Sequence, residues 1–220
     1  MANTAQELKF IYRRRFQETA SYRNKVWRIL TTDFFSRWIT KDHVVLDVGC
    51  GWGEFINHVS AGHKFGIDLN PDTRHRLNKD IQFFEQDCST QWPLPNDTLD
   101  VVFTSNFFEH LPTKAALSAT LKEAYTALKE GGKLIAMGPN IKYLPGSYWD
   151  FFDHHIPLSD MSLAEAMEFA GFEIEYIAPR FLPYTLVNAP EYPLFLLKIY
   201  LKMPWLWWIK GRQFLIVGRK

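Results

Sequence analysis

The sequence predicts an α/β protein with a doubly wound, mostly parallel sheet. From Val44 onward, short runs rich in β-branched residues alternate with stretches of helical periodicity, the order that produces parallel strands joined by crossover helices. The runs are mostly apolar, as expected of strands that helices cover on both faces. A glycine-rich turn at 49–53 follows the first run directly, which places a ligand at the carboxyl ends of the strands.

Residues 1–43 are expected to form an N-terminal helical arm. Val26, Leu30 and Phe34 recur at four-residue steps and predict one apolar helix stripe. The basic stretch 11–16, IYRRRF, is assigned to a preceding helix or arm that either joins a surface contact or closes over the ligand.

A core at 44–140 and a C-terminal part at 141–220 complete a single domain. Pro71 suits the first turn of a short helix, and glycines follow the two longer helices. We expect strands at 43–48, 64–69, 81–86, 99–106, 133–138, 172–178 and 213–219, and helices at 54–61, 70–79, 112–130 and 158–170.

Composition indicates an ordinary globular chain, with 47% apolar and 22% charged residues. Cys50 and Cys88 lack the spacing of a metal site and are expected to be free thiols in a reducing compartment. The first ten residues contain no apolar signal-peptide segment. We therefore expect a cytoplasmic protein, with peripheral contact to the inner membrane face as an open alternative.

The charge is unevenly distributed along the chain. Residues 1–43 carry nine Lys/Arg and four Asp/Glu, residues 44–195 carry ten and twenty, and residues 196–220 carry six and none. The acidic centre argues against nucleic-acid binding, whereas the basic ends are candidate contacts for an anionic surface.

The turn in VVLDVGCGWGEF has three interpretations. A tight strand-to-helix corner needs only one glycine. A dinucleotide site needs G-x-G-x-x-G, but Glu54 stands where the third glycine belongs, and its carboxylate competes with a pyrophosphate for the helix N-terminus. The third interpretation is D-x-G-x-G-x-G, matched by Asp47, Gly49, Gly51 and Gly53.

This loop resembles the cofactor loop of the class I, Rossmann-like methyltransferases, which bind S-adenosylmethionine. Residues 92–112, WPLPNDTLDVVFTSNFFEHLP, look like the fourth-strand region of their broad small-molecule, or type 11, group. Residues 128–140, LKEGGKLIAMGPN, look like the segment that leads into the fifth strand. The resemblance runs from Val44 to Asn140, is specific for fold and cofactor, and implies seven strands with the last one antiparallel.

Carboxylates follow the second and third predicted strands. Asp68 lies 21 residues after Asp47, where a carboxylate can accept both ribose hydroxyls. In the family, an acidic residue at the position of Asp87 contacts the adenine amino group. For both residues a plain loop aspartate is the alternative. The resemblance assigns cofactor contacts to Asp47, Gly49, Cys50, Gly51, Gly53, Asp68, Leu69, Asp87, Cys88 and Asn106, and no His/Cys cluster suggests a metal.

Methyl transfer depends mainly on alignment, and a base is needed only where the acceptor must lose a proton. His154 and His155, beside Asp153 in the aromatic loop after the fifth strand, are the preferred candidates. Their side chains should point apart, so at most one of them faces the acceptor. His110 is a third candidate. A histidine that is hydrogen-bonded within its loop is the alternative for each.

An aromatic insert at 187–211 separates the last two strands, and it contains Trp205, Trp207 and Trp208. Lysines and a proline interrupt its apolar runs, so no uninterrupted run is long enough to span a bilayer. It can form a lid, a dimer surface or, at 193–210, an interfacial helix whose lysines face anionic lipid. The third option implies a lipid-linked acceptor.

The sequence therefore predicts an S-adenosylmethionine-dependent methyltransferase that acts at oxygen on a small or lipid-linked acceptor. Two alternatives remain at this point: an NAD(P)-dependent reductase, and a non-catalytic S-adenosylmethionine-binding protein.

Overall fold

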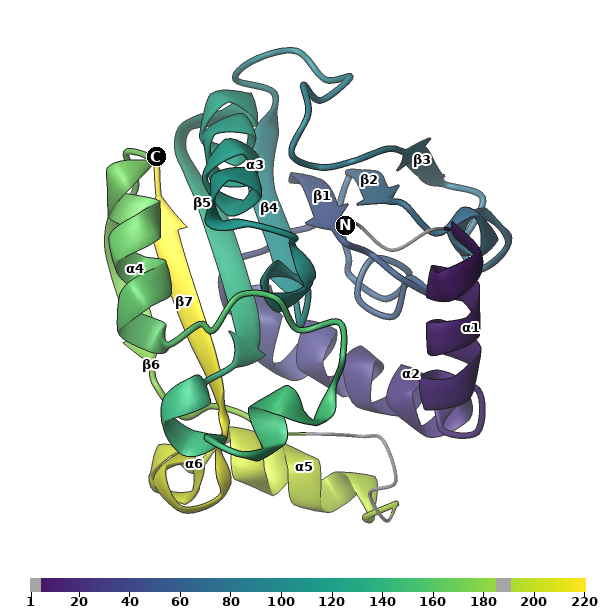
Figure 1. Cartoon of the computed structure of the whole chain (residues 1–220), viewed down its shortest axis with the longest axis vertical. Coiled ribbons are helices and arrows are strands. Elements are labelled where there is room, and N and C mark those ends of the chain that lie inside the picture. Colours follow the sequence, from purple (N-terminus) through teal and green to yellow (C-terminus); the bar gives the residue numbers. More distant parts are fainter. Residues whose placement is uncertain (1–4, 185–190) are drawn as a thin grey trace.

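A computed structural model describes residues 5–184 and 191–220. Its sheet has the strand order β3-β2-β1-β4-β5-β7-β6 (Figure 1). Strands β1 to β5 run parallel to one another, and β7 lies antiparallel between β5 and β6. The predicted fold is thereby confirmed. The strands are β1 (Val44–Val48), β2 (His63–Asp68), β3 (Ile81–Glu85), β4 (Leu99–Ser105), β5 (Leu128–Pro139), β6 (Glu173–Ala178) and β7 (Gln213–Arg219).

Side chains of the central strands alternate between two apolar cores. In β4, Val102 belongs to one core and Phe103 to the other, because successive side chains of a strand point to opposite faces. The first core lies under α3 (Lys114–Ala127) and α4 (Asp160–Phe169), which cover the same face of the sheet in Figure 1. The second core packs against α2 (Ala20–Ile29), α5 (Leu194–Leu201) and α6 (Pro204–Lys210).

The helix predicted at 54–61 is wrong. Residues after the glycine loop form little more than one turn, with the N–H of Asn57 donating to Gly53 O (2.9 Å) and that of Val59 to Phe55 O (3.0 Å). The ring of Phe55 stacks on Phe103 at 3.6 Å between centroids. This anchor fixes the segment on the sheet, and the chain then turns directly into β2.

Two other predicted helices are shorter than expected. The segment at 70–79 contains only a 3₁₀ helix, Pro71–His75. Helix α3 begins after Thr113, whose hydroxyl accepts from the N–H of Ala116 (3.1 Å), and it ends at Ala127 because β5 starts at the next residue.

The N-terminal arm and the insert before β7 are both helical, as predicted. The arm consists of α1 (Ala5–Phe16) and α2, which continues as a π-helical turn at Leu30–Phe34. The insert forms α5 and α6, while the part of it at 187–190 lies outside the described residues. Among the helices described, none has the length and apolar character needed to cross a membrane.

Candidate cofactor and acceptor site

The three alternate glycines after β1 all adopt left-handed backbone conformations. The φ angles of Gly49, Gly51 and Gly53 are 70°, 54° and 77°. Residues other than glycine rarely adopt this left-handed region. The N–H groups of Gly49 and Cys50 donate to Ile67 O in β2 (2.9 and 3.2 Å). The loop is thus held at the carboxyl ends of β1 and β2, where the sequence predicted it.

Aromatic rings from two distant segments lie directly on this loop. A Cβ at Gly49 would lie 2.2 Å from the ring of Phe107, and a Cβ at Gly51 would lie 2.9 Å from the Tyr12 hydroxyl. Helix α1 therefore crosses the cofactor loop. Tyr12 was not singled out from the sequence, because nothing in the basic run around it indicates which side chain faces inward.

Three carboxylates gather behind the loop. The side chain of Asp68 accepts from the N–H of Gly51 and from that of Asn70, both at 2.7 Å. Burial raises the pKa of Asp68 to about 6. Burial, followed by the charges of Asp68 and Glu54, raises the pKa of Asp47 well above its ordinary value. The site is therefore short of positive charge.

Glu54 is the exception among the three, because it has a cationic partner. Its Oε1 lies 2.9 Å from a guanidinium nitrogen of Arg23 in α2. The residue that departs from the dinucleotide pattern is thus tied to the N-terminal arm.

These residues fit S-adenosylmethionine, which carries a sulfonium and an ammonium group. Asp47 and Asp68 are buried carboxylates that a cationic ligand would stabilise. Asp68 is the last residue of β2, and a carboxylate at this strand end can accept hydrogen bonds from ribose hydroxyls. A pyrophosphate would instead meet acidic side chains, so the geometry favours the sulfonium cofactor over a dinucleotide.

The two predicted cysteines point away from the loop. A Cβ at Gly66 would lie 2.9 Å from Cys50 Sγ, so this thiol covers β2. Cys88 Sγ lies 3.4 Å from the Thr120 hydroxyl of α3, inside the core. Both are free thiols, and both are buried.

The remaining predicted cofactor residues follow β2, β3 and β4. Leu69 presents an exposed side chain next to Asp68. Asp87 accepts from the N–H of Ser89 (2.8 Å) in a local turn. Asn106 has a positive φ of 50°, and its N–H donates to Met137 O of β5 (2.8 Å).

A second polar group lies beyond Asn106. Glu109 and His110 occupy a 3₁₀ helix, Phe108–His110, and the loop after β5 brings Asp153 and His154 against them. His110 Nδ1 lies 3.0 Å from the backbone O of Asp153 and 3.2 Å from its Oδ2. His110 Nε2 lies 3.9 Å from Glu109 Oε1, and the rings of His110 and His154 are 4.8 Å apart between centroids.

Burial and charge perturb every member of this group. Burial raises the pKa of Glu109 to about 7. Burial and then the charge of His110 lower the pKa of His154 to about 3. Burial opposes protonation of His110, but the hydrogen bond of Asp153 and the charges of Glu109 and Asp153 hold its pKa above the ordinary value.

The structure separates the two adjacent histidines. His154 is 6% exposed, and its Nδ1 has no hydrogen-bond partner within the described part of the chain. The His155 side chain is exposed, while its backbone N–H donates to Glu109 O (2.8 Å). Of the pair that the sequence could not distinguish, His154 is the one placed beside His110 and Glu109.

Two residues that the sequence did not single out hold this loop. The hydroxyl of the fully buried Tyr148 donates to Ile156 O and accepts from the N–H of Leu158 (3.1 Å). Arg15 of α1 donates twice to Asp153, at 2.6 and 3.0 Å. The arm therefore reaches both polar groups, with Tyr12 on the glycine loop and Arg15 on Asp153 beside His110.

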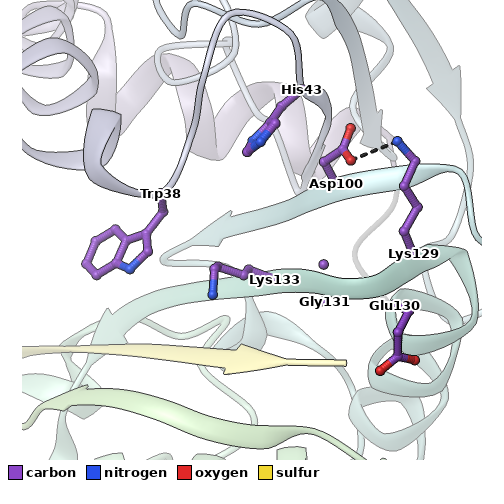
Figure 2. A pocket seen from close by; sticks show the side chains of 8 residues that line it. Trp38, His43, Asp100, Lys129, Glu130, Gly131 and Lys133 are labelled. Carbon is purple, nitrogen blue, oxygen red and sulfur yellow. Dashed lines mark hydrogen bonds and ion pairs between the residues drawn. The ribbon is translucent and has the colours of Figure 1, made fainter.

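A pocket of about 110 Å³ lies at the other end of the strands, where β1, β4 and β5 begin. Figure 2 shows Trp38, Lys133 and the ion pair of Lys129 with Asp100 around it. These residues precede or begin β1, β4 and β5, whereas open α/β sheets bind ligands at the carboxyl ends of their strands. We do not assign this pocket to the reaction.

The fold and the site define a class I, Rossmann-like, S-adenosylmethionine-dependent methyltransferase. Residues 18–177 match the family model described as a methyltransferase domain, and the chain belongs to this family. The predictions of enzyme class and cofactor are confirmed, and the reductase and non-catalytic alternatives are not supported.

Three relatives illustrate the match. An uncharacterized protein of Methanocaldococcus jannaschii is 33% identical over 166 residues, which cover 72% of this chain and 67% of that protein. A protein of Mycolicibacterium smegmatis described as a probable S-adenosylmethionine-dependent methyltransferase is 28% identical, over 60% of this chain and 52% of its own length. A crystal structure of a SAM-dependent methyltransferase from Archaeoglobus fulgidus superposes with a TM-score of 0.68 at 20% identity, over 93% of this chain and 99% of that one.

Proposed function

We propose that this methyltransferase modifies a hydroxyl oxygen of a small or lipid-linked acceptor. The observation that carries the proposal is the continuity between the two halves of the site. Phe107 lies on Gly49 of the cofactor loop, and Glu109 and His110 follow it within three residues. An acceptor that contacts these polar side chains therefore lies next to the cofactor.

The cofactor half is assigned to the residues that the sequence predicted. The backbone of the glycine loop receives the amino-acid end of S-adenosylmethionine, Asp68 receives the ribose hydroxyls, and the segment at Asp87 and Cys88 receives the adenine. When bound, S-adenosylmethionine supplies an electrophilic methyl group on a sulfonium. Tyr12 covers Gly51, and this cover excludes water from the reacting centre.

The acceptor half is assigned to the polar group of Glu109, His110 and His154. A hydroxyl is a weak nucleophile until its proton is withdrawn, and this group offers a buried carboxylate and a neutral imidazole within one small volume. Its main work is to align the acceptor oxygen and to polarise the O–H bond.

The proposal of a lipid-linked acceptor rests on the surface of α5 and α6. Trp207 and Leu201 are buried against the core, whereas the neighbouring apolar side chains are exposed. No acidic residue occurs at 196–220, so this surface suits anionic lipid. The exposed set is Phe195, Leu196, Ile199, Trp205, Trp208 and Ile209.

Transfer of a labelled methyl group into a cell extract, followed by isolation of the labelled product, tests the proposal. A product methylated at oxygen supports it, and a product methylated at nitrogen or carbon overturns the oxygen assignment. Calorimetry of the protein with S-adenosylhomocysteine should show tight binding. Asp68→Ala should weaken this binding by about 1–3 kcal/mol, because the buried ribose hydroxyls lose their hydrogen-bond acceptor. NAD(P)H should not bind.

A further inference from the structure

Glu109, His110 and His154 form a compact group of oxygen and nitrogen donors. One potential ligand atom from each lies within 4.8 Å of those of the other two. The group joins the segment after β4 with the loop after β5, so residues 44 positions apart in the numbering converge only in the folded chain. The three residues do not have the sequence spacing of a metal-binding motif, so the sequence alone does not predict the group.

Each histidine has a ring nitrogen that is free to bind a ligand. His110 Nδ1 bonds to Asp153, which leaves Nε2 directed toward Glu109. The Nδ1 atom of the buried His154 lacks a hydrogen-bond partner among the described residues. Metal-binding histidines characteristically use one nitrogen as ligand and hold the other on a carboxylate or carbonyl.

Without a cation, the group is poorly satisfied. The Glu109 side chain is 2% exposed, and within the described part of the chain its ion-pair partner is His110 at 3.9 Å, beyond hydrogen-bond distance. A buried carboxylate without a closely placed cation and a buried imidazole nitrogen without a hydrogen-bond partner are each costly. One divalent cation would satisfy both.

We propose that Glu109, His110 and His154 bind one divalent transition-metal cation of the Zn²⁺ or Co²⁺ type. Two imidazoles and one carboxylate are a common ligand set for such ions, and three protein ligands leave further positions open. In a tetrahedral site with bond lengths of about 2.0–2.2 Å, two ligand atoms lie about 3.3–3.6 Å apart. The most separated pair of the group therefore closes by about an ångström on binding, through rotation of side chains.

The open positions point to the role of the ion, and this role rests on the proposed function. They would bind the acceptor oxygen and a neighbouring oxygen of the same molecule, which favours acceptors with two adjacent oxygen donors. Arg15 and Asp153 then act as positioning residues, because their ion pair holds the Nδ1 side of His110.

Calorimetry and absorption spectroscopy of the full chain test the site. After removal of bound metal with a chelator, Co²⁺ should bind with a stoichiometry of one and give visible d–d absorption, and Zn²⁺ should displace it. Glu109→Gln and His154→Ala should each weaken Co²⁺ binding on the order of 100-fold or more. Asp153→Asn should weaken it by about 10–100-fold, the effect typical of residues that support a ligand. His155→Ala is the matched control, because its exposed side chain lies outside the group, and it should bind Co²⁺ as the parent does.

The proposal is overturned if the parent chain does not bind Co²⁺, or if both ligand variants bind it unchanged. It is also overturned if His155→Ala abolishes binding. Binding of S-adenosylhomocysteine and near-ultraviolet circular dichroism report whether each variant is folded, and Asp153→Asn gives the answer if Glu109→Gln does not fold. Methyl transfer to oxygen that persists with chelator in a metal-free chain overturns the metal site alone. Metal binding without any methyl transfer to oxygen overturns the proposed function alone.

Discussion

Arg15 of α1 and Asp153 of the loop after β5 form a bidentate ion pair, with N···O distances of 2.6 and 3.0 Å. The pair joins the N-terminal arm to the acceptor side of the site across 138 positions of sequence. Burial would raise the pKa of Asp153, but hydrogen bonds from His110 and Arg15 hold it well below its usual range. A loop and an arm that would otherwise be independent are thereby held in one arrangement.

Arg15→Ala is expected to lower the free energy of unfolding by roughly 2 kcal/mol. This is less than the ~3–5 kcal/mol typical of breaking a buried pair, because His110 still bonds to Asp153. Arg13→Ala is the matched control in the same helix. Its pair with Asp72 is 3.4 Å long and its side chain is 66% exposed, so its effect should stay below about 0.5 kcal/mol. Urea unfolding of both variants measures the difference, and equal losses would show that the arm is not held through Asp153.

Gly49→Ala is expected to abolish cofactor binding. The added methyl would lie 2.2 Å from the Phe107 ring and would occupy a backbone with φ of 70°. Gly131→Ala is the control, because Gly131 has a φ of 77° but no atom within 4 Å of an added Cβ. It should lose only about 1 kcal/mol of stability, with unchanged affinity for S-adenosylhomocysteine by calorimetry. Retention of affinity in Gly49→Ala would place the cofactor elsewhere.

Affinity for S-adenosylhomocysteine is expected to fall as the pH drops through about 6. The folded pKa of Asp68 is about 6, and the ionised carboxylate accepts hydrogen bonds from hydroxyls best. The ligand therefore binds the ionised form. Below about pH 6 Asp68 must first release its proton, which lowers the affinity. The same shift affects stability with the opposite sign. Because the folded pKa exceeds the unfolded value of 3.8, the contribution of Asp68 to stability is present below pH 3.8 and is lost as the pH rises through 6.

Calorimetry between pH 5 and pH 8 measures the binding effect. Asp68→Asn is the control, since an amide does not titrate and its affinity should depend less on pH. A pH dependence identical to that of the parent chain would assign the titration to another group, of which Asp47 is the nearest candidate.

Trp208→Glu is expected to reduce binding to anionic liposomes. Trp208 is 61% exposed on α6, and Lys202 and Lys210 near it in the chain are also exposed. A carboxylate at position 208 would oppose insertion into anionic lipid. Phe169→Glu is the control, because Phe169 is 82% exposed on α4, outside the proposed surface. Liposome flotation compares them. Equal flotation of both variants and the parent would contradict the membrane proposal.

Local pattern was sufficient for most of the fold. Short apolar runs located the strands because strands that helices cover on both faces are apolar along their length, and the spacing of Gly49, Gly51 and Gly53 predicted the cofactor loop because left-handed backbone strongly favours glycine. The helix predicted at 54–61 does not form, for a tertiary reason. Phe55 stacks on Phe103 of a strand almost fifty residues later, and a local pattern contains no information about that contact.

The sequence by itself therefore determined the architecture, the cofactor and the residues that follow each strand, since these depend on short-range periodicity and backbone conformation. Only the tertiary structure decided between His154 and His155, placed Tyr12 on Gly51, and brought Glu109, His110 and His154 together. Such groupings arise where loops of different strands meet at one edge of a sheet. Side-chain direction there is set by packing between distant segments, and no spacing along the chain records it.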